Sequence, residues 1–136
     1  MINQMAVLAP AVDREGNYSA TELAKLMGWS VDEISKYLER SPTTVYRNPS
    51  TDGYQDQLGA LAGLFRDIVV AFTPAAGTEG LHGPSTESLE PVAAAKAWLR
   101  TSIYALNGKS PKDKIIAGDI GAIRRLVSEY ASGLAY

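Results

Sequence analysis

Hydrophobic residues recur every three or four positions through most of this chain, a pattern that is typical of amphipathic helices. The strongest run predicts a long helix from Gln57 to Phe72, with one apolar stripe formed by Leu58, Leu61, Phe65, Ile68 and Phe72. The strict alternation that indicates strands never lasts beyond about four residues. We therefore expect an all-α fold.

Three short helices are predicted ahead of this long helix, and each has a hydroxyl residue at its start: Ser19 or Thr21 for the first, Ser30 for the second and Ser41 for the third. A serine before the first helical residue accepts a hydrogen bond from a backbone amide of the first turn and so fixes where the helix begins. In the second helix Glu33 lies three residues after Ser30 and predicts a capping box. The expected helices are Thr21 to Met27, Val31 to Glu39 and Pro42 to Arg47.

The last part of the chain predicts three further helices. An alanine-rich segment from Val92 to Thr101 has high helix propensity. Ser110 caps a short helix from Pro111 to Ala117, and Gly118 ends it. The final helix begins after Asp119 and carries Ile120, Ile123, Val127, Tyr130 and Leu134 at helical spacing.

These patterns divide the chain into four segments. Residues 1–18 contain turn residues and no sustained period, and we interpret them as an N-terminal arm. Residues 19–72 form a helix-turn-helix-like bundle with the long packing helix. Residues 73–91 are rich in Gly and Pro and are interpreted as a linker or mobile loop. Residues 92–136 form a small C-terminal helical module.

The composition narrows the classes of function. Hydrophobic residues make up 46% and charged residues 21% of the 136, which is typical of a folded domain. No cysteine is present, and the single histidine has no second imidazole beside it for a metal site. No carboxylates are spaced for acid-base chemistry. We expect no enzyme activity, no metal and no cofactor. No apolar run approaches the roughly 20 residues of a membrane span, so we expect a cytoplasmic protein without a membrane contact.

Charge is unevenly distributed, although the net charge is only −2. Residues 1–72 carry six Lys/Arg against nine Asp/Glu, a balance of 6 − 9 = −3. Residues 91–136 carry seven against three, a balance of 7 − 3 = +4. The net negative charge of the first half repels DNA phosphates and so argues against DNA binding by this half.

Two helix-turn-helix registers fit residues 20–48. In the first, Ala20 to Glu39 is the unit and Gly28 lies in the turn. In the second, Val31 to Glu39 is the supporting helix and the next helix reads DNA. We favour the second, because the first would bring Asp32, Glu33 and Glu39 against phosphates. It assigns DNA contacts to Thr43, Thr44, Tyr46, Arg47 and Asn48.

The C-terminal motifs have a family resemblance. The chain contains Trp98-Leu99, then Leu106-x-Gly108-x-x-Pro111, the aliphatic pair Ile115-Ile116, Gly118, and a helix that ends in Gly133-Leu134-Ala135-Tyr136. This order resembles the toxin-binding domain of Xre/MbcA/ParS-type antitoxins. The spacing of Leu26, Gly28 and Ile34, followed by Ser41-Pro42 and Arg47, is similar to the N-terminal half of the same family.

The resemblance implies a function in a type II toxin-antitoxin system. Such a protein binds and occludes a cognate toxin encoded nearby, commonly a RES-domain toxin that consumes NAD, and we also expect autoregulation through operator DNA. The family places its C-terminal end at the toxin's pocket. The expected toxin-binding residues are Trp98, Leu106, Gly108, Tyr130, Gly133, Leu134 and Tyr136.

Two points stay open at this stage. The apolar stripe of the long helix fits either core packing or a dimer interface, and helix-turn-helix proteins commonly bind paired half-sites, so we expect a homodimer. The alternative function is a stand-alone helix-turn-helix transcriptional regulator, in which the C-terminal module only dimerises.

Overall fold

A computed structural model of the chain describes residues 7–73 and 90–131, and all regular elements in these two ranges are helices. The all-α prediction is confirmed. An isolated antiparallel bridge joins Val12 and Tyr18. No helix in the described ranges is both long enough and apolar enough to cross a bilayer.

In chain order the elements are η1 (Ala9–Ala11), α2 (Ala20–Met27), α3 (Val31–Leu38), α4 (Pro42–Arg47), η2 (Asp52–Tyr54), α5 (Gln55–Ala71), α7 (Pro91–Leu99), η3 (Tyr104–Leu106), α8 (Pro111–Ile116) and α9 (Ile120–Ala131).

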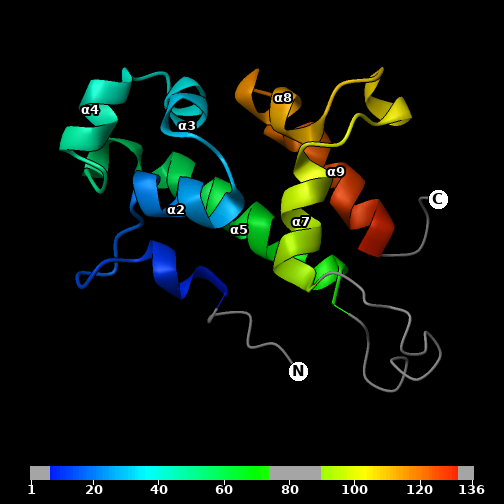
Figure 1. The fold of residues 1–136 in the computed structure, drawn as a ribbon, viewed down its shortest axis with the longest axis horizontal. Helices are drawn as coiled ribbons and strands as arrows, with labels where there is room; N and C mark the ends of the chain where they lie inside the picture. The colour runs from blue at the N-terminus through cyan, green and yellow to red at the C-terminus, as the bar shows by residue number, and fades with distance from the viewer. Residues whose placement is uncertain (1–6, 74–89, 132–136) are drawn as a thin grey trace.

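Helix α5 crosses the middle of the molecule and gives both halves a common core. Helices α2, α3 and α4 lie towards one end of α5, and α7, α8 and α9 lie towards the other (Figure 1). Helix α5 contacts α2 on one side and α7 and α9 on the other. Its predicted stripe is buried at Leu58, Leu61, Phe65 and Ile68. This stripe is therefore filled within one chain and gives no argument for a second copy.

The helix starts follow from the caps that the sequence contains. The hydroxyl oxygens of Ser19, Ser41 and Ser110 accept hydrogen bonds from the amides three residues later, at 3.3, 3.2 and 3.1 Å. Each bond satisfies a backbone amide that has no partner within the helix. Helix α2 ends at Gly28, whose φ of 77° lies in the left-handed region that glycine adopts without strain.

Part of the predicted arm belongs to the core. The side chains of Val7, Leu8 and Ala11 are buried, and η1 packs against α2. The Ser19 amide donates to the Ala11 carbonyl at 2.8 Å, which holds this segment at the start of α2. The signal was missed because three apolar residues around a proline are too few to show a period.

Candidate partner-binding surface

Two aromatic side chains from the expected toxin-binding set meet between α7 and α9. The rings of Trp98 and Tyr130 lie 6.1 Å apart, centroid to centroid, with an interplanar angle of 75°. This edge-to-face arrangement directs the positive edge of one ring at the negative face of the other. Trp98 is half-buried against the core, and Tyr130 is 37% exposed. The pair therefore packs on the interior and still offers aromatic surface to solvent.

An apolar groove opens beside this aromatic pair, where the C-terminal end of α5 meets α7 and α9. We call it the α5–α7–α9 groove; its volume is about 260 Å³ and its lining residues are Ile68, Ala71, Phe72, Trp98, Val127 and Tyr130. Phe72 is 41% exposed although it belongs to the apolar stripe of α5. Contiguous exposed apolar surface on a small protein is typical of an interaction site.

A larger hollow of about 620 Å³ adjoins the groove and shares the lining residues Ala71, Val127 and Tyr130 with it. Its lining is more polar, with Asp67 from α5 and Arg124 and Ser128 from α9. Tyr130 lines both hollows, so they meet near the end of α9. The exposed apolar surface and the charged groups are therefore neighbours, as in the core and rim of a protein interface.

The other expected toxin-binding residues lie apart from this pair or beyond the described ranges. Leu106 is half-buried against the core, and Gly108 is exposed in the turn before α8 with a φ of 81°. Gly133, Leu134 and Tyr136 lie outside the residues that the structure describes. The same turn also exposes Tyr104, which the sequence patterns did not single out.

The five residues expected to contact DNA all lie on or directly after α4 and are exposed: Thr43, Thr44, Tyr46, Arg47 and Asn48. The short helix is held by the buried side chain of Val45. At its end, the hydroxyl of Tyr54 donates to the Asn48 carbonyl. Helices α2, α3 and α4 contact one another, an arrangement that both registers require. The register therefore stays a prediction.

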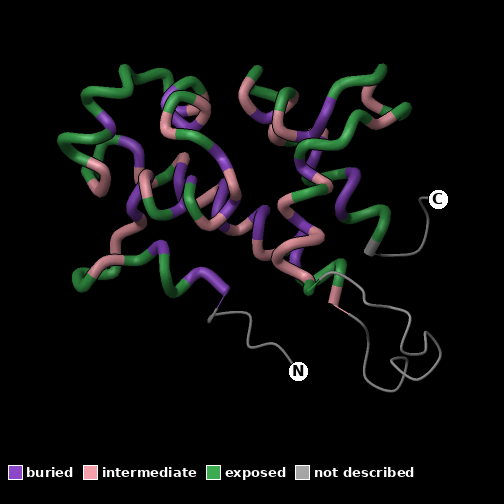
Figure 2. Tube along the Cα trace, viewed as in Figure 1, coloured by how far each residue is buried: buried purple, intermediate pink, exposed green. Residues whose placement is uncertain are grey.

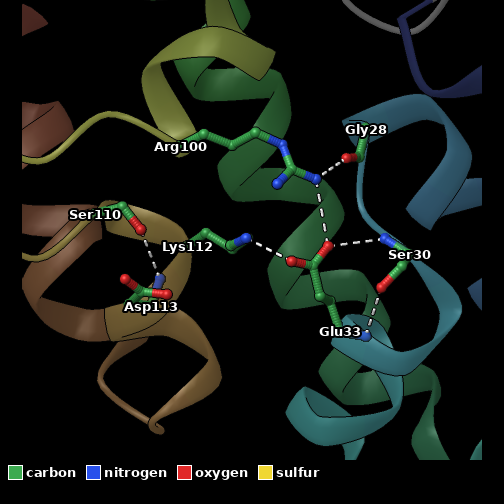
Figure 3. Close-up of polar contacts among 7 residues, drawn as sticks. All are labelled: Gly28, Ser30, Glu33, Arg100, Ser110, Lys112 and Asp113. Atoms are coloured by element: carbon green, nitrogen blue, oxygen red, sulfur yellow. Dashed lines mark hydrogen bonds and ion pairs between the residues drawn. The ribbon is translucent and has the colours of Figure 1, made fainter.

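A polar cluster joins the two halves of the molecule, and its centre is Glu33 on α3 (Figure 3). The predicted capping box is confirmed: the Ser30 amide donates to Glu33 Oε1 at 2.8 Å, and the Glu33 amide donates to Ser30 Oγ at 3.1 Å. The same carboxylate also accepts from Lys112 on α8 and from Arg100 Nη2 at 3.3 Å. We call these four residues the Glu33 cluster.

The surroundings of Glu33 favour its charged form. Burial by itself raises the pKa of Glu33, but the hydrogen bonds from Lys112 and from the Ser30 amide, together with the positive charges of Lys112 and Arg100, lower it from 4.5 to about 2. Arg100 also donates to the carbonyl of Gly28, which ends α2. One arginine therefore holds both the end of α2 and the start of α3, and the carboxylate remains ionised at neutral pH.

The sequence predicted the capping box but not the partners of its carboxylate. Arg100 and Lys112 are 67 and 79 residues away from Glu33 along the chain. Spacing predicts contacts within a helix, but this contact depends on how α3 packs against α8. Within the described ranges, no group of three or more His, Cys, Asp or Glu side chains is placed to hold a metal ion.

Comparison with known proteins gives one informative result. No family model matches the chain, and no curated protein matches its sequence. Among solved structures, the fold is similar to that of a chain in the crystal structure of the M. tuberculosis MbcT-MbcA toxin-antitoxin complex. The TM-score is 0.56 at 16% sequence identity, and the match covers 86% of this chain and 94% of that chain. The match shows a common fold over nearly all of both chains.

Proposed function

We propose that this chain is the antitoxin of a type II toxin-antitoxin system and that it neutralises a cognate toxin by binding to it. The observation that carries the proposal is the common fold with a chain of a toxin-antitoxin complex over 86% of this chain. A match of this extent leaves only 100 − 86 = 14% of this chain unmatched, so it extends into both halves. The C-terminal motifs that resemble the toxin-binding domain of this antitoxin class support the same function.

The α5–α7–α9 groove supports a binding function for the C-terminal half. Trp98, Tyr130 and Phe72 supply large aromatic surfaces, and tyrosine and tryptophan contribute strongly to binding energy at protein interfaces. The groove is apolar, while Asp67 and Arg124 lie in the adjoining hollow. On this proposal the chain acts by occupying a surface of the toxin, without catalysis and without a cofactor.

The finer proposal is that the toxin is a RES-domain protein that consumes NAD. The support is the resemblance of residues 98–136 to the toxin-binding domain of this antitoxin class. Members of that class place their C-terminal end at the toxin's pocket. A direct assay measures NAD loss with the purified partner alone and after addition of this chain. We expect NAD loss that stops at equimolar chain; a partner that never consumes NAD belongs to another toxin class.

We also propose that α4 binds operator DNA and so autoregulates the operon. The support is a set of exposed hydroxyl, amide and guanidinium groups on one short helix, with Val45 buried beneath them. The alternative is a stand-alone regulator with a C-terminal module that only dimerises. That alternative predicts operator binding by a homodimer, with no stable complex with any neighbouring gene product.

Co-purification tests the proposed function directly. The chain is expressed together with the protein encoded by the adjacent reading frame, and the mixture is separated by size exclusion at micromolar concentration. We expect one complex, which Tyr130→Ala weakens because that residue lines the groove. Arg14→Ala, in an exposed turn of the N-terminal half, is the control and leaves the complex intact. Separate elution of the two unsubstituted proteins would argue strongly against an antitoxin.

A further inference from the structure

Tyr104 is the most solvent-exposed large hydrophobic residue among those that the structure describes, with 99% of its surface open. It lies in η3, in the turn that leads from α7 to α8. Tyr104 is neither part of the apolar core nor packed against it, so core packing does not explain an aromatic residue at this position. An exposed aromatic side chain indicates a binding site most strongly when hydrogen bonds hold its backbone in one conformation.

The backbone beneath Tyr104 is fixed by its own hydrogen bonds. The amides of Leu106 and Gly108 both donate to the Ile103 carbonyl, at 2.9 and 3.0 Å, and the Ile103 amide donates to the Lys109 carbonyl at 3.1 Å. The Asn107 amide donates to the backbone carbonyl of Tyr104 at 2.9 Å. We call residues 103–109 the Tyr104 loop. The loop closes on itself and leaves the tyrosine side chain open to solvent.

Two neighbouring residues in the left-handed region make this closure possible. Asn107 has a φ of 60° and Gly108 a φ of 81°, conformations that asparagine and glycine adopt more readily than other residues. Leu106 packs its side chain against the core and anchors the loop from below. The partner therefore meets an aromatic side chain on an ordered support, and ordering the loop on binding costs little conformational entropy.

The charge around the loop indicates the chemistry of the partner. Residues 91–112 contain four Lys/Arg and no Asp or Glu. Arg100 and Lys112 are already bonded to Glu33, whereas Lys109 is exposed and has no ion pair among the described residues. An exposed aromatic group beside a free ammonium group fits an apolar pocket with an acidic rim.

We propose that Tyr104 is an anchor residue for the toxin: it enters an apolar pocket on the partner protein, and Lys109 faces acidic residues at the rim of that pocket. This proposal rests on the antitoxin function proposed above and extends it to a second contact region. The Tyr104 loop and the end of α9 both lie on the side of the molecule away from α4 (Figure 1). A partner that reached both would leave α4 free.

Nucleic acid is a less suitable partner for this loop. Stacking on Tyr104 is chemically possible, but binding to a phosphate backbone requires several cations or free amide groups. The amides of residues 106–109 donate within the loop, and Glu33 holds two of the nearest cations. Lys109 is left as the main phosphate contact in residues 99–112, which is too small a basic surface for nucleic acid.

The test measures the affinity of the full chain for the co-expressed product of the adjacent reading frame by titration calorimetry. We expect Tyr104→Ala to raise the Kd about tenfold to a hundredfold, as truncation of an aromatic anchor does. Tyr104→Phe retains the ring and stays within about threefold of the unsubstituted chain. Lys109→Glu weakens binding most at low ionic strength, because charge repulsion is screened by salt. Arg14→Ala is again the control.

The outcomes separate this inference from the proposed function. Because Tyr104 is 99% exposed, Tyr104→Ala should leave the thermal melt unchanged, so weaker binding reports a lost contact and not unfolding. Tight binding by the unsubstituted chain that Tyr104→Ala does not alter overturns the anchor and leaves the antitoxin proposal standing. No binding by the unsubstituted chain overturns both. Reduced affinity of Tyr104→Ala for a duplex of the upstream DNA, with toxin binding unchanged, would also refute the anchor.

Discussion

The two halves of this molecule differ in how completely they cover their apolar residues. Around α2, α3 and α4 the side chains of Leu23, Met27, Ile34, Leu38 and Val45 are all buried, and the exposed aromatic residue there is Tyr46 on α4. Around α7 and α9, Trp98 is only half-buried and Tyr130 is exposed, beside the exposed Phe72 at the end of α5. In Figure 2 buried residues lie along α2 and α5, whereas the turn after α7 and most of α4 are exposed.

Under the proposed function the two halves have separate tasks, although they share one core. The N-terminal half buries most of its large apolar side chains, but Tyr46 is exposed among the polar groups of α4. The C-terminal half leaves aromatic surface exposed beside α7 and α9, and under the proposed function the toxin covers it. Helix α5 and the Glu33 cluster hold the two halves together, so the open half does not need a complete core of its own. The predictions below test this division, beginning with the largest expected effect.

The shared core is tested most severely at Phe65, which is fully buried on α5. We expect Phe65→Ala to lower the free energy of unfolding by about 3 to 5 kcal/mol, because the lost ring leaves a cavity.

The chain has two tryptophans, Trp29 near α2 and Trp98 on α7, so Trp98→Phe and Trp29→Phe leave one fluorescent reporter in each half. Urea curves from the two reporters should coincide. Clearly separated midpoints would mean that the halves fold independently.

The polar face of α4 is tested at Arg47. If Arg47 reads a base, Arg47→Ala weakens operator binding by about 1 to 3 kcal/mol; if it contacts phosphate, the loss is smaller and uniform across sequences. Lys36 on α3 serves as the matched basic control in gel-shift titrations. A loss with Lys36→Ala and none with Arg47→Ala would favour the register that reads DNA with α3.

The connection between the halves is tested at Glu33 and Lys112. We expect Lys112→Ala to lower the free energy of unfolding by about 1 to 2 kcal/mol, between the values for exposed ion pairs and for hydrogen bonds to charged groups. Glu33→Gln removes the charge but retains an acceptor for the Ser30 amide. In a double-mutant cycle the two losses should not add. The pair of Lys114 and Asp119, which is more exposed than Glu33 and Lys112, is the control, with a coupling below about 0.5 kcal/mol.

The same cluster predicts a pH dependence with a definite sign. The pKa of Glu33 falls from 4.5 to about 2 in the folded chain, so its contribution to stability is fully present above pH 4.5 and is lost as the pH falls towards 2. Urea titrations of the unsubstituted chain and Glu33→Gln should therefore converge across that window. A constant difference between them from pH 6 to pH 2 would rule out the ionised cluster as its cause.

The helices could be predicted from the sequence because their signals are local. The serine caps, the capping box at Ser30 and the glycine at the end of α2 each act within one turn, and the structure confirms them. The aromatic pair of Trp98 and Tyr130 and the Glu33 cluster could not be derived from spacing, because helix packing creates them. The residues of the pair were expected at the partner surface only through the family resemblance.

Amide hydrogen exchange of the purified complex tests the central claim most directly, since it reports which half the partner covers. The proposal predicts slower exchange, relative to the free chain, in α7, the Tyr104 loop and α9, with α4 unchanged. Protection confined to residues 42–48, with exchange in residues 91–131 as in the free chain, would contradict the assignment of partner binding to the C-terminal half.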